Sequence, residues 1–463
     1  MDQGTDHTFI FDQTSFDLKE QTAYFSFSLR SPDGEETEFT ETLHWPTSFP
    51  SKTIALLDTT AGKETLSAYL KLLHITIGMN YWKLVCTPHI EGADGLSQSQ
   101  QFYFKDLYTF GFGELFYKNK LNFESRIPFH PKEHTRHSSQ PIIENPYPLI
   151  GIGGGKDSLV ALEILRSKNI PHRGLVIETM GNTDMISTLF DQLDTEILHV
   201  EHTLDTKLFE LNRTNKYFNG HVPFSARVAG IGSMSAWLYG HDTFFAANEH
   251  SASFGNLPYL GIEINHQWSK SFAFERNFQE YLCESVPNGA WYASLLRPFT
   301  EIRIAQLFSQ YPQYFHHATS CNKAFTIQKE NRSVKPWCCS CPKCAFVFAL
   351  YAAFIPKQTV LSIFGENLFD KQSLLPLYQE LLGKKDTKPF ECVGTPDETM
   401  LAFALALRTG EYDGDFIAEY VKREYLPEFL MDDAVRSELQ TMYESSMPLA
   451  YVSAVEDIHE RNL

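Results

Sequence analysis

Hydrophobic and polar positions follow a strand-like period in the first part of the chain. Apolar and polar side chains alternate along Tyr24–Leu29, which predicts a half-buried strand, and Glu38–Trp45 predicts a second one. The apolar positions of Leu66–Ile77 have the spacing of a helix. Residues 1–128 are therefore predicted to form an N-terminal α+β domain, in which no residue pattern suggests chemistry.

Short apolar runs alternate with helical segments farther along the chain. Residues 129–148, rich in proline, histidine and serine, predict a linker. The runs after it predict strands at Leu149–Ile152, Leu175–Ile177, Ile197–Val200 and Thr243–Ala247, with helices such as Ser158–Arg166 between them. Such alternation predicts an α/β fold over residues 149–345, a parallel sheet with helices on both faces. Ligands of these sheets bind at the carboxyl ends of the strands.

Helical spacing dominates residues 346–463, which are predicted to form a helical C-terminal region. The segments with this spacing are Ala345–Phe354, Lys371–Leu382, Glu398–Leu407 and Phe416–Tyr425. A length of 463 residues and an apolar content of 43% suit a globular protein of two or three domains.

The charge of the chain limits its partners. Lys and Arg number 39 against 57 Asp and Glu, so the formal net charge is −18. An acidic surface repels phosphate backbones and anionic lipids, so we expect neither a nucleic acid nor a membrane as partner. The longest apolar run, Ala345–Ile355, is shorter than the roughly 20 residues of a membrane-spanning helix. The first residues lack a signal-peptide pattern, and the expected location is the cytoplasm.

A glycine-rich turn follows the first predicted strand of the α/β region, Gly153-Gly154-Gly155-Lys156-Asp157-Ser158. Backbone N–H groups of such a turn, together with the positive end of the next helix, bind phosphate. Ile150 and Asp157 exclude the loop G-x-x-x-x-G-K-S/T, and Lys156 excludes G-x-G-x-x-G. The pattern Gly-Gly-x-Asp-Ser resembles the pyrophosphate loop (PP-loop) of the ATP pyrophosphatases, with Gly153 in place of the usual leading serine. The six residues are thus predicted to bind ATP phosphates, with Lys156 and Asp157 also acting in catalysis.

Five of the eight cysteines lie between Cys321 and Cys344. This clustering favours a local site in a reduced protein over scattered disulfides. Cys321, Cys338, Cys341 and Cys344 could supply four thiolates to a structural zinc ion, which leaves Cys339 spare. The alternatives are a group of reduced core thiols and a catalytic thiolate that acts as a carbon base.

Three polar stretches, Asn219–Ser225, Ala247–Ser253 and Gly261–Ser271, are further candidates for chemistry. The second directly follows a predicted strand, where a parallel sheet opens to its ligand. The alternative interpretation of each stretch is a solvated loop.

In the glycine turn, the polar stretches and the cysteine segment, the chain resembles the UDP-N-acetylmuramoyl-L-alanyl-L-glutamate epimerases of bacterial cell-wall synthesis. The resemblance extends to about residue 430 and rests on these segments: 153–158, 220–223, 248–251, 265–270, 337–344 and 391–395. It implies ATP- and Mg2+-dependent inversion of a terminal L-glutamate on a UDP-muramoyl dipeptide through an acyl-adenylate. Glu249, His266 and Lys270 are then the candidates for the two proton carriers, because they cluster in polar stretches after the sheet.

Two other functions remain open. A nitrile-forming or thiolating ATP pyrophosphatase would also use the glycine turn and the cysteines, although the acidic charge disfavours a tRNA substrate. The second is a zinc-bearing, nucleotide-binding module without turnover, which the missing serine at Gly153 suggests.

Overall fold

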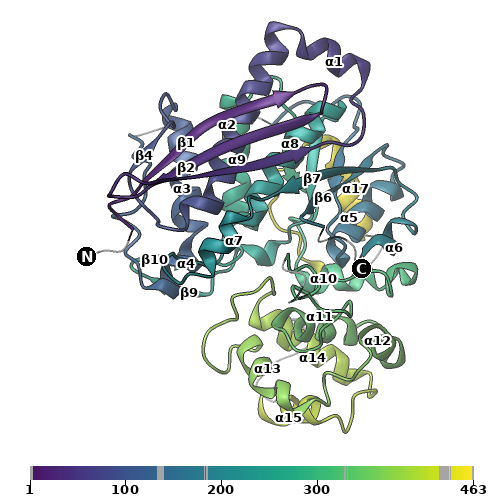
Figure 1. The fold of residues 1–463 in the computed structure, drawn as a ribbon. Coiled ribbons are helices and arrows are strands. Elements are labelled where there is room, and N and C mark those ends of the chain that lie inside the picture. The colour runs from purple at the N-terminus through teal and green to yellow at the C-terminus, as the bar shows by residue number, and fades with distance from the viewer. Residues whose placement is uncertain are drawn as a thin grey trace.

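A nine-stranded sheet forms the centre of the structure (Figure 1). The computed structural model describes residues 4–132, 140–181, 183, 186–327, 330, 332–426, 437 and 439–460. The strands stand in the order β11-β8-β5-β6-β7-β3-β2-β1-β4. Their bounds are β1 Thr8–Asp17, β2 Thr22–Arg30, β3 Glu36–His44, β4 Ile90–Glu91, β5 Leu149–Gly151, β6 Arg173–Thr179, β7 Ile197–Thr203, β8 Thr243–Ala246 and β11 Trp291–Ser294. A separate hairpin pairs β9 (Leu257–Tyr259) with β10 (Ile262–Ile264).

The strands predicted in the two halves of the chain belong to one sheet. All neighbouring pairs from β11 to β7 are parallel, as the alternating pattern predicts. At β7 the direction changes, because Thr42 of β3 pairs antiparallel with Thr203 of β7. The boundary predicted at residue 128 therefore does not separate two sheets. The domain boundaries stay a prediction, and residues 133–139 of the predicted linker lie outside the described residues.

Helices cover the sheet and form a second lobe. Their bounds are α1 Ser51–Leu57, α2 Thr60–Trp82, α3 Gln98–Phe110, α4 Gly113–Asn119, α5 Lys156–Ser167, α6 Ser187–Phe190, α7 Lys207–Asn212, α8 Phe224–Tyr239, α9 Phe272–Ser285, α10 Glu301–Phe308, α11 Pro342–Ala352, α12 Lys357–Phe364, α13 Leu375–Leu381, α14 Pro396–Arg408, α15 Phe416–Glu424 and α17 Leu449–Glu460. Short 3-10 turns include η2 (His250–Ser253), η3 (Trp268–Lys270), η4 (Pro312–Tyr314) and η6 (Gln372–Leu374). None of the described helices is long and apolar enough to cross a membrane.

Successive side chains of the central strands point to opposite faces of the sheet, and each face has its own core. Leu149 and Leu175 pack with α2, α8 and α9 on one face. Ile150 and Val176 pack with α5 and α10 on the other face. Both faces of the parallel part are thus buried under helices, which confirms the predicted α/β layering; the finer PP-loop fold stays a prediction.

Small residues let α8 lie close against the sheet. A Cβ atom at Gly232 would come within 2.1 Å of the Phe244 ring on β8, so glycine is required there. On the same helix, Ser235 accepts a hydrogen bond of 2.9 Å from the Trp45 indole, which joins the N-terminal segment to α8.

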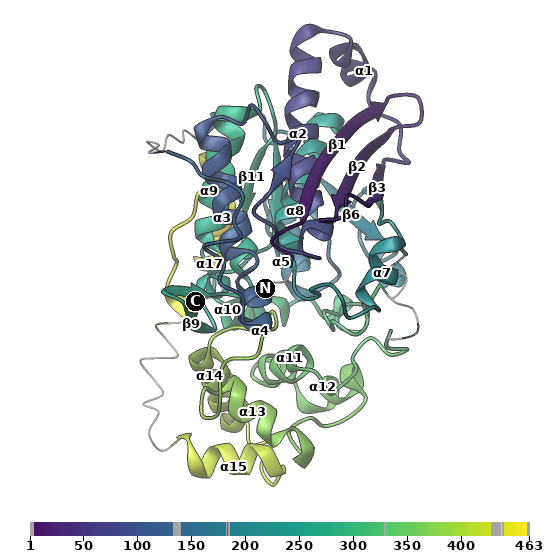
Figure 2. The ribbon, with the colours of Figure 1, turned by 60° about the vertical axis from the view of Figure 1, so that its left-hand side comes forward.

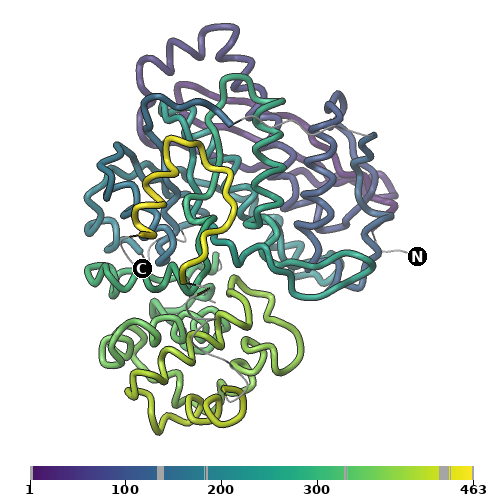
Figure 3. Tube along the Cα trace, turned by 180° about the vertical axis from the view of Figure 1, so that it is seen from behind, coloured from purple at the N-terminus to yellow at the C-terminus, as the bar shows by residue number. Residues whose placement is uncertain are grey.

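The helical lobe of α11 to α15 lies below the sheet in Figure 1, and Figure 2 shows it as a separate layer from another side. This lobe confirms the helical C-terminal region predicted from the apolar spacing. The last helix, α17, returns to pack against α5, as the yellow end of the tube shows in Figure 3. Its Tyr451 hydroxyl donates a hydrogen bond of 2.5 Å to Asp242, just before β8.

Candidate active site

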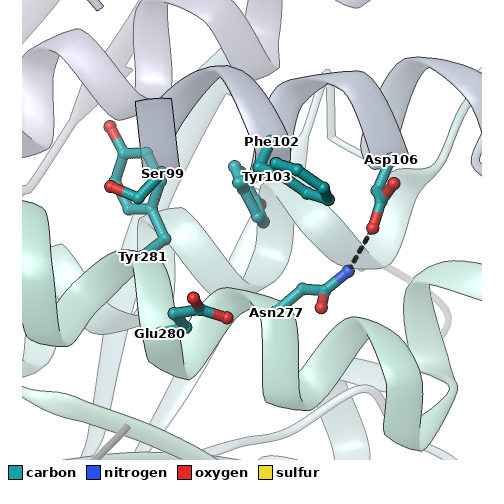
Figure 4. A pocket seen from close by; sticks show the side chains of 7 residues that line it. All are labelled: Ser99, Phe102, Tyr103, Asp106, Asn277, Glu280 and Tyr281. Carbon is teal, nitrogen blue, oxygen red and sulfur yellow. Dashed lines mark hydrogen bonds between the residues drawn. The ribbon is translucent and has the colours of Figure 1, made fainter. Parts of the chain in front are cut away.

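A cavity of about 460 Å3 lies beside the carboxyl ends of β5 and β8. Its volume is within the ~300–1,000 Å3 of small-molecule sites. The narrow space between α3 and α9, shown in Figure 4, holds only about 10 Å3, room for about one water. The Asn277 amide donates a hydrogen bond of 2.7 Å to Asp106 across that space. The larger cavity is therefore the candidate active site.

The glycine turn forms one wall of this cavity. β5 ends at Gly151, α5 begins at Lys156, and the lining includes Gly153, Gly155, Asp157 and Ser158. Gly154 has a φ of +82°, a left-handed conformation that side chains disfavour. Behind the turn, Thr319 donates its backbone N–H to the Gly154 carbonyl at 2.9 Å, so the segment before Cys321 supports the loop.

Lys156 does not line the cavity. Its ammonium is buried, with 2% of the side chain exposed, and pairs with Asp157 and with Glu301 of α10. These two carboxylates outweigh the effect of burial and raise the pKa of Lys156 above its usual range. Lys343 on α11 shares Glu301 at 3.4 Å and lines the cavity. Burial alone raises the pKa of Glu301, but the two lysines lower it to about 2.

Asn248 and Glu249 follow the end of β8 after one residue, Ala247, so they lie at the carboxyl end of this strand as predicted. Asn248 lines the cavity and donates a hydrogen bond of 3.1 Å to the Tyr292 hydroxyl. Glu249 lies buried behind the lining, where burial first and then Glu301 raise its pKa to about 7. Arg297 is fully buried and donates to the carbonyls of Glu249 at 2.5 Å and Lys270 at 2.6 Å. It thereby holds the two polar stretches together.

His266 and Lys270 lie on the cavity wall; His266 precedes the short turn η3, and Lys270 is its last residue. His266 Nδ1 hydrogen-bonds Glu114 of α4 at 2.5 Å. The His221 ring lies against the His266 ring with centroids 4.4 Å apart. Glu114 belongs to the N-terminal region, in which no residue pattern suggested chemistry, so this region contributes a residue that supports the cavity wall. No local pattern identifies Glu114, because only long-range packing brings it to His266.

Cys392 is a further cavity residue that the sequence patterns did not select as a site residue. It lies in the loop between α13 and α14 and lines the cavity together with His266 and Lys270. Although burial raises its pKa, Lys270, His266 and Lys343 lower it to about 5. The segment 391–395 was available as a signal, because it is one of those that carry the family resemblance.

The four cysteines predicted as zinc ligands come together at the start of α11. Their sulfur atoms all lie within 4.8 Å of one another, and the Cys341 and Cys344 sulfurs are 3.4 Å apart. Four sulfurs at about 2.3 Å from a tetrahedral zinc ion would be roughly 3.8 Å apart, so the group fits that ion. Cys339 turns away, since its sulfur hydrogen-bonds the Phe364 carbonyl at 3.3 Å. The cluster would fix both the segment behind the glycine turn and the start of α11.

The predicted site residues thus divide into three groups. Six line the cavity: Gly153, Gly155, Asp157, Ser158, His266 and Lys270. Gly154, Lys156 and Glu249 support it from behind, and the cysteines form a separate cluster.

Comparison with known proteins shows to which family the chain belongs. Residues 1–295 match the MurL N-terminal domain, and residues 317–435 match the MurL C-terminal domain. A protein of Xanthomonas oryzae pv. oryzae, named UDP-N-acetyl-alpha-D-muramoyl-L-alanyl-L-glutamate epimerase, is 35% identical over 81% of this chain and 82% of its own length. A protein of Salinispora tropica with the same name is 33% identical over 98% of this chain and 97% of its own length.

Proposed function

Because the chain belongs to the family of the UDP-N-acetyl-alpha-D-muramoyl-L-alanyl-L-glutamate epimerases, we propose that it inverts the terminal L-glutamate of that nucleotide-linked dipeptide. The reaction would use ATP and Mg2+, form an acyl-adenylate, and release AMP and diphosphate. Its product, the D-glutamate form, is a precursor of peptidoglycan.

The chemistry explains why an epimerase of this kind would need ATP. The C–H bond beside a free carboxylate is a very weak acid, because a carbanion would form next to a negative charge. Adenylation removes that charge and provides a carbonyl oxygen that can carry the enolate. A base then takes the proton from one face of the α carbon, and an acid returns one to the other face; each such group contributes about 10²–10⁴-fold. Donors near the oxygen stabilise the enolate.

The observation that carries the proposal is that the glycine turn and the cluster of ionisable side chains line one cavity. The turn offers backbone N–H groups for phosphate at the amino end of α5. Lys270 and Lys343, from segments far apart in sequence, also line the cavity and supply positive charge near the phosphates. Lys156, which pairs with Glu301, supports the turn in this scheme rather than contacting the α phosphate.

The residues at the glycine turn also suit Mg2+. This ion prefers one or two carboxylates together with substrate phosphates, and Asp157 is the carboxylate among the described residues that line the cavity. Bound there, Mg2+ would neutralise phosphate charge. A structural zinc ion would be held by Cys321, Cys338, Cys341 and Cys344, whose sulfurs lie close enough together for it.

The test mixes the purified protein with ATP, Mg2+ and UDP-N-acetylmuramoyl-L-alanyl-L-glutamate. We expect AMP to appear only when the dipeptide nucleotide is present, together with D-glutamate in the hydrolysed product. Asp157→Asn is expected to lower AMP release by at least tenfold, whereas Asp33→Asn, in the exposed turn between β2 and β3, leaves it unchanged. AMP formation without D-glutamate would favour another ATP pyrophosphatase activity. No ATP turnover would favour a nucleotide-binding module.

A further inference from the structure

The loop that carries Cys392 is fixed against the polar stretch before α9. Gln267 donates its side-chain amide to the Val393 carbonyl at 2.9 Å. The loop then enters α14 through a capping box, in which the Glu398 carboxylate accepts the Thr395 N–H at 2.7 Å. These bonds hold the Cys392 sulfur on the cavity wall, next to His266 and Lys270.

Cys392 and His266 line the same cavity wall, and Glu114 lies behind His266. His266 Nδ1 hydrogen-bonds the Glu114 carboxylate at 2.5 Å, and the His266 ring shares the cavity wall with Cys392, whose charge it feels. Glu114 is only 5% exposed, and its other oxygen pairs with Lys118. A thiolate, an imidazole and an orienting carboxylate in this order are a known arrangement for an activated sulfur.

The charges identify which member of this chain can accept a proton. Burial alone lowers the pKa of His266, but Cys392 and Glu114 raise it to about 9, so the imidazole is protonated at neutral pH. The pKa of Cys392 is about 5, so its sulfur is a thiolate at the same pH. The charged groups that face this sulfur are His266, Lys270, Lys343, Lys388 and Glu391.

We propose that Cys392 is the proton carrier on one face of the glutamate α carbon, held in place by His266 and Glu114. This rests on the proposed function. The thiolate takes the α proton, so that an S–H bond forms as the C–H bond breaks. The C–H electron pair moves into the activated carbonyl, which becomes an enolate, and a donor on the opposite face returns a proton to carbon. Solvent then restores both groups.

In this scheme His266 is a positioning residue, not the carrier predicted from the sequence. Its Nδ1–H is bonded to the Glu114 carboxylate, which keeps the ring protonated, and the positive ring stabilises the sulfur as an anion until the substrate proton arrives. His221 carries no competing charge, because burial and the His266 cation lower its pKa to about 3.

The test measures activation and inversion separately in D2O with ATP, Mg2+ and the UDP-muramoyl dipeptide. For Cys392→Ser we expect AMP release within about tenfold of the native rate, while D-glutamate formation and deuterium at the α carbon fall about 10²–10⁴-fold. Cys283→Ser, at an exposed cysteine of α9, is the matched control. Inversion at the native rate in Cys392→Ser would overturn the inference. Absence of AMP and inversion in the native protein would instead overturn the proposed function.

A second measurement needs no substrate. The rate at which iodoacetamide alkylates Cys392, followed by mass spectrometry of its peptide, is expected to titrate near pH 5 in the native protein. His266→Gln removes a neighbouring cation and is expected to move this midpoint towards the ordinary thiol value of about 8.5. An alkylation midpoint of the native protein already near pH 8.5 would contradict the proposal that His266 stabilises the Cys392 thiolate. A midpoint that His266→Gln leaves unchanged would contradict it as well.

Discussion

Two neighbouring glycines of the phosphate turn are expected to respond oppositely to alanine. Gly154 has a φ of +82°, and a Cβ atom there would lie 2.7 Å from the Ile186 side chain. At Gly153, by contrast, a Cβ atom would meet nothing within 4 Å, and its φ is not positive. Comparing Gly154→Ala with Gly153→Ala therefore separates the cost of backbone strain at Gly154 from the loss of chain flexibility that any glycine-to-alanine change causes.

The magnitude follows from three contributions. A left-handed backbone costs a non-glycine residue about 1–2 kcal/mol. The contact with Ile186 adds overpacking, which typically costs about 1–3 kcal/mol. Alanine also restricts the unfolded chain, which stabilises the protein by about 0.4–1 kcal/mol at a compatible site. With the middle of each range, Gly154→Ala should lower the free energy of unfolding by about 3 kcal/mol, whereas Gly153→Ala should raise it slightly.

Thermal unfolding followed by circular dichroism checks this expectation. In a unit of 150–250 residues, about 1 kcal/mol shifts the melting temperature by ~2–4 °C. The Gly154→Ala protein should therefore melt roughly 6–12 °C below the Gly153→Ala protein. Equal melting temperatures would show that the turn does not hold Gly154 in the left-handed conformation, and the reasoning about the turn would fail.

Three further outcomes concern metal, charge and the thiolate. Cys344→Ser should lose the zinc that metal analysis detects after purification, whereas Cys339→Ser should keep it; equal zinc in both would exclude the cluster as the site. Glu301→Gln leaves the buried Lys343 without its carboxylate and Lys156 with Asp157 alone. It should lower the free energy of unfolding, measured in urea at pH 7, by about 3–5 kcal/mol. Because the folded pKa of Glu301, about 2, lies below the unfolded value, its stabilisation is full above about pH 4.5 and is lost as pH falls through 2. The difference in the free energy of unfolding between Glu301→Gln and the native protein should become smaller as pH falls over that range. A difference that does not change with pH would argue against the ion pair. Lys270→Met should raise the alkylation midpoint of Cys392 above 5, because it removes a neighbouring cation; a lower midpoint would refute this.

Much of the fold could be predicted because its cause is local. The period of two along Tyr24–Leu29 and the glycines after Leu149–Gly151 each act within a few residues. Strand β11 was missed, since its Trp291–Ser294 is a short, fully buried run without alternation. The sequence also did not predict that the strands of the N-terminal region and of the α/β region form one sheet. The two sets meet where β3 pairs with β7, and this pairing joins residues some 160 positions apart in the chain.

The sequence by itself determined the strand, glycine turn and helix that form one wall of the cavity, and the four sulfurs that meet behind it. Backbone conformation and residue spacing along the chain are local properties, which the sequence displays directly. Only the tertiary structure decided which charged groups face the cavity. It buries Lys156 against Glu301, brings Lys343 to the wall, and joins Glu114 to His266 across 152 residues. The physical reason is that protonation and hydrogen bonding depend on neighbours in space, which periodicity along the chain does not encode.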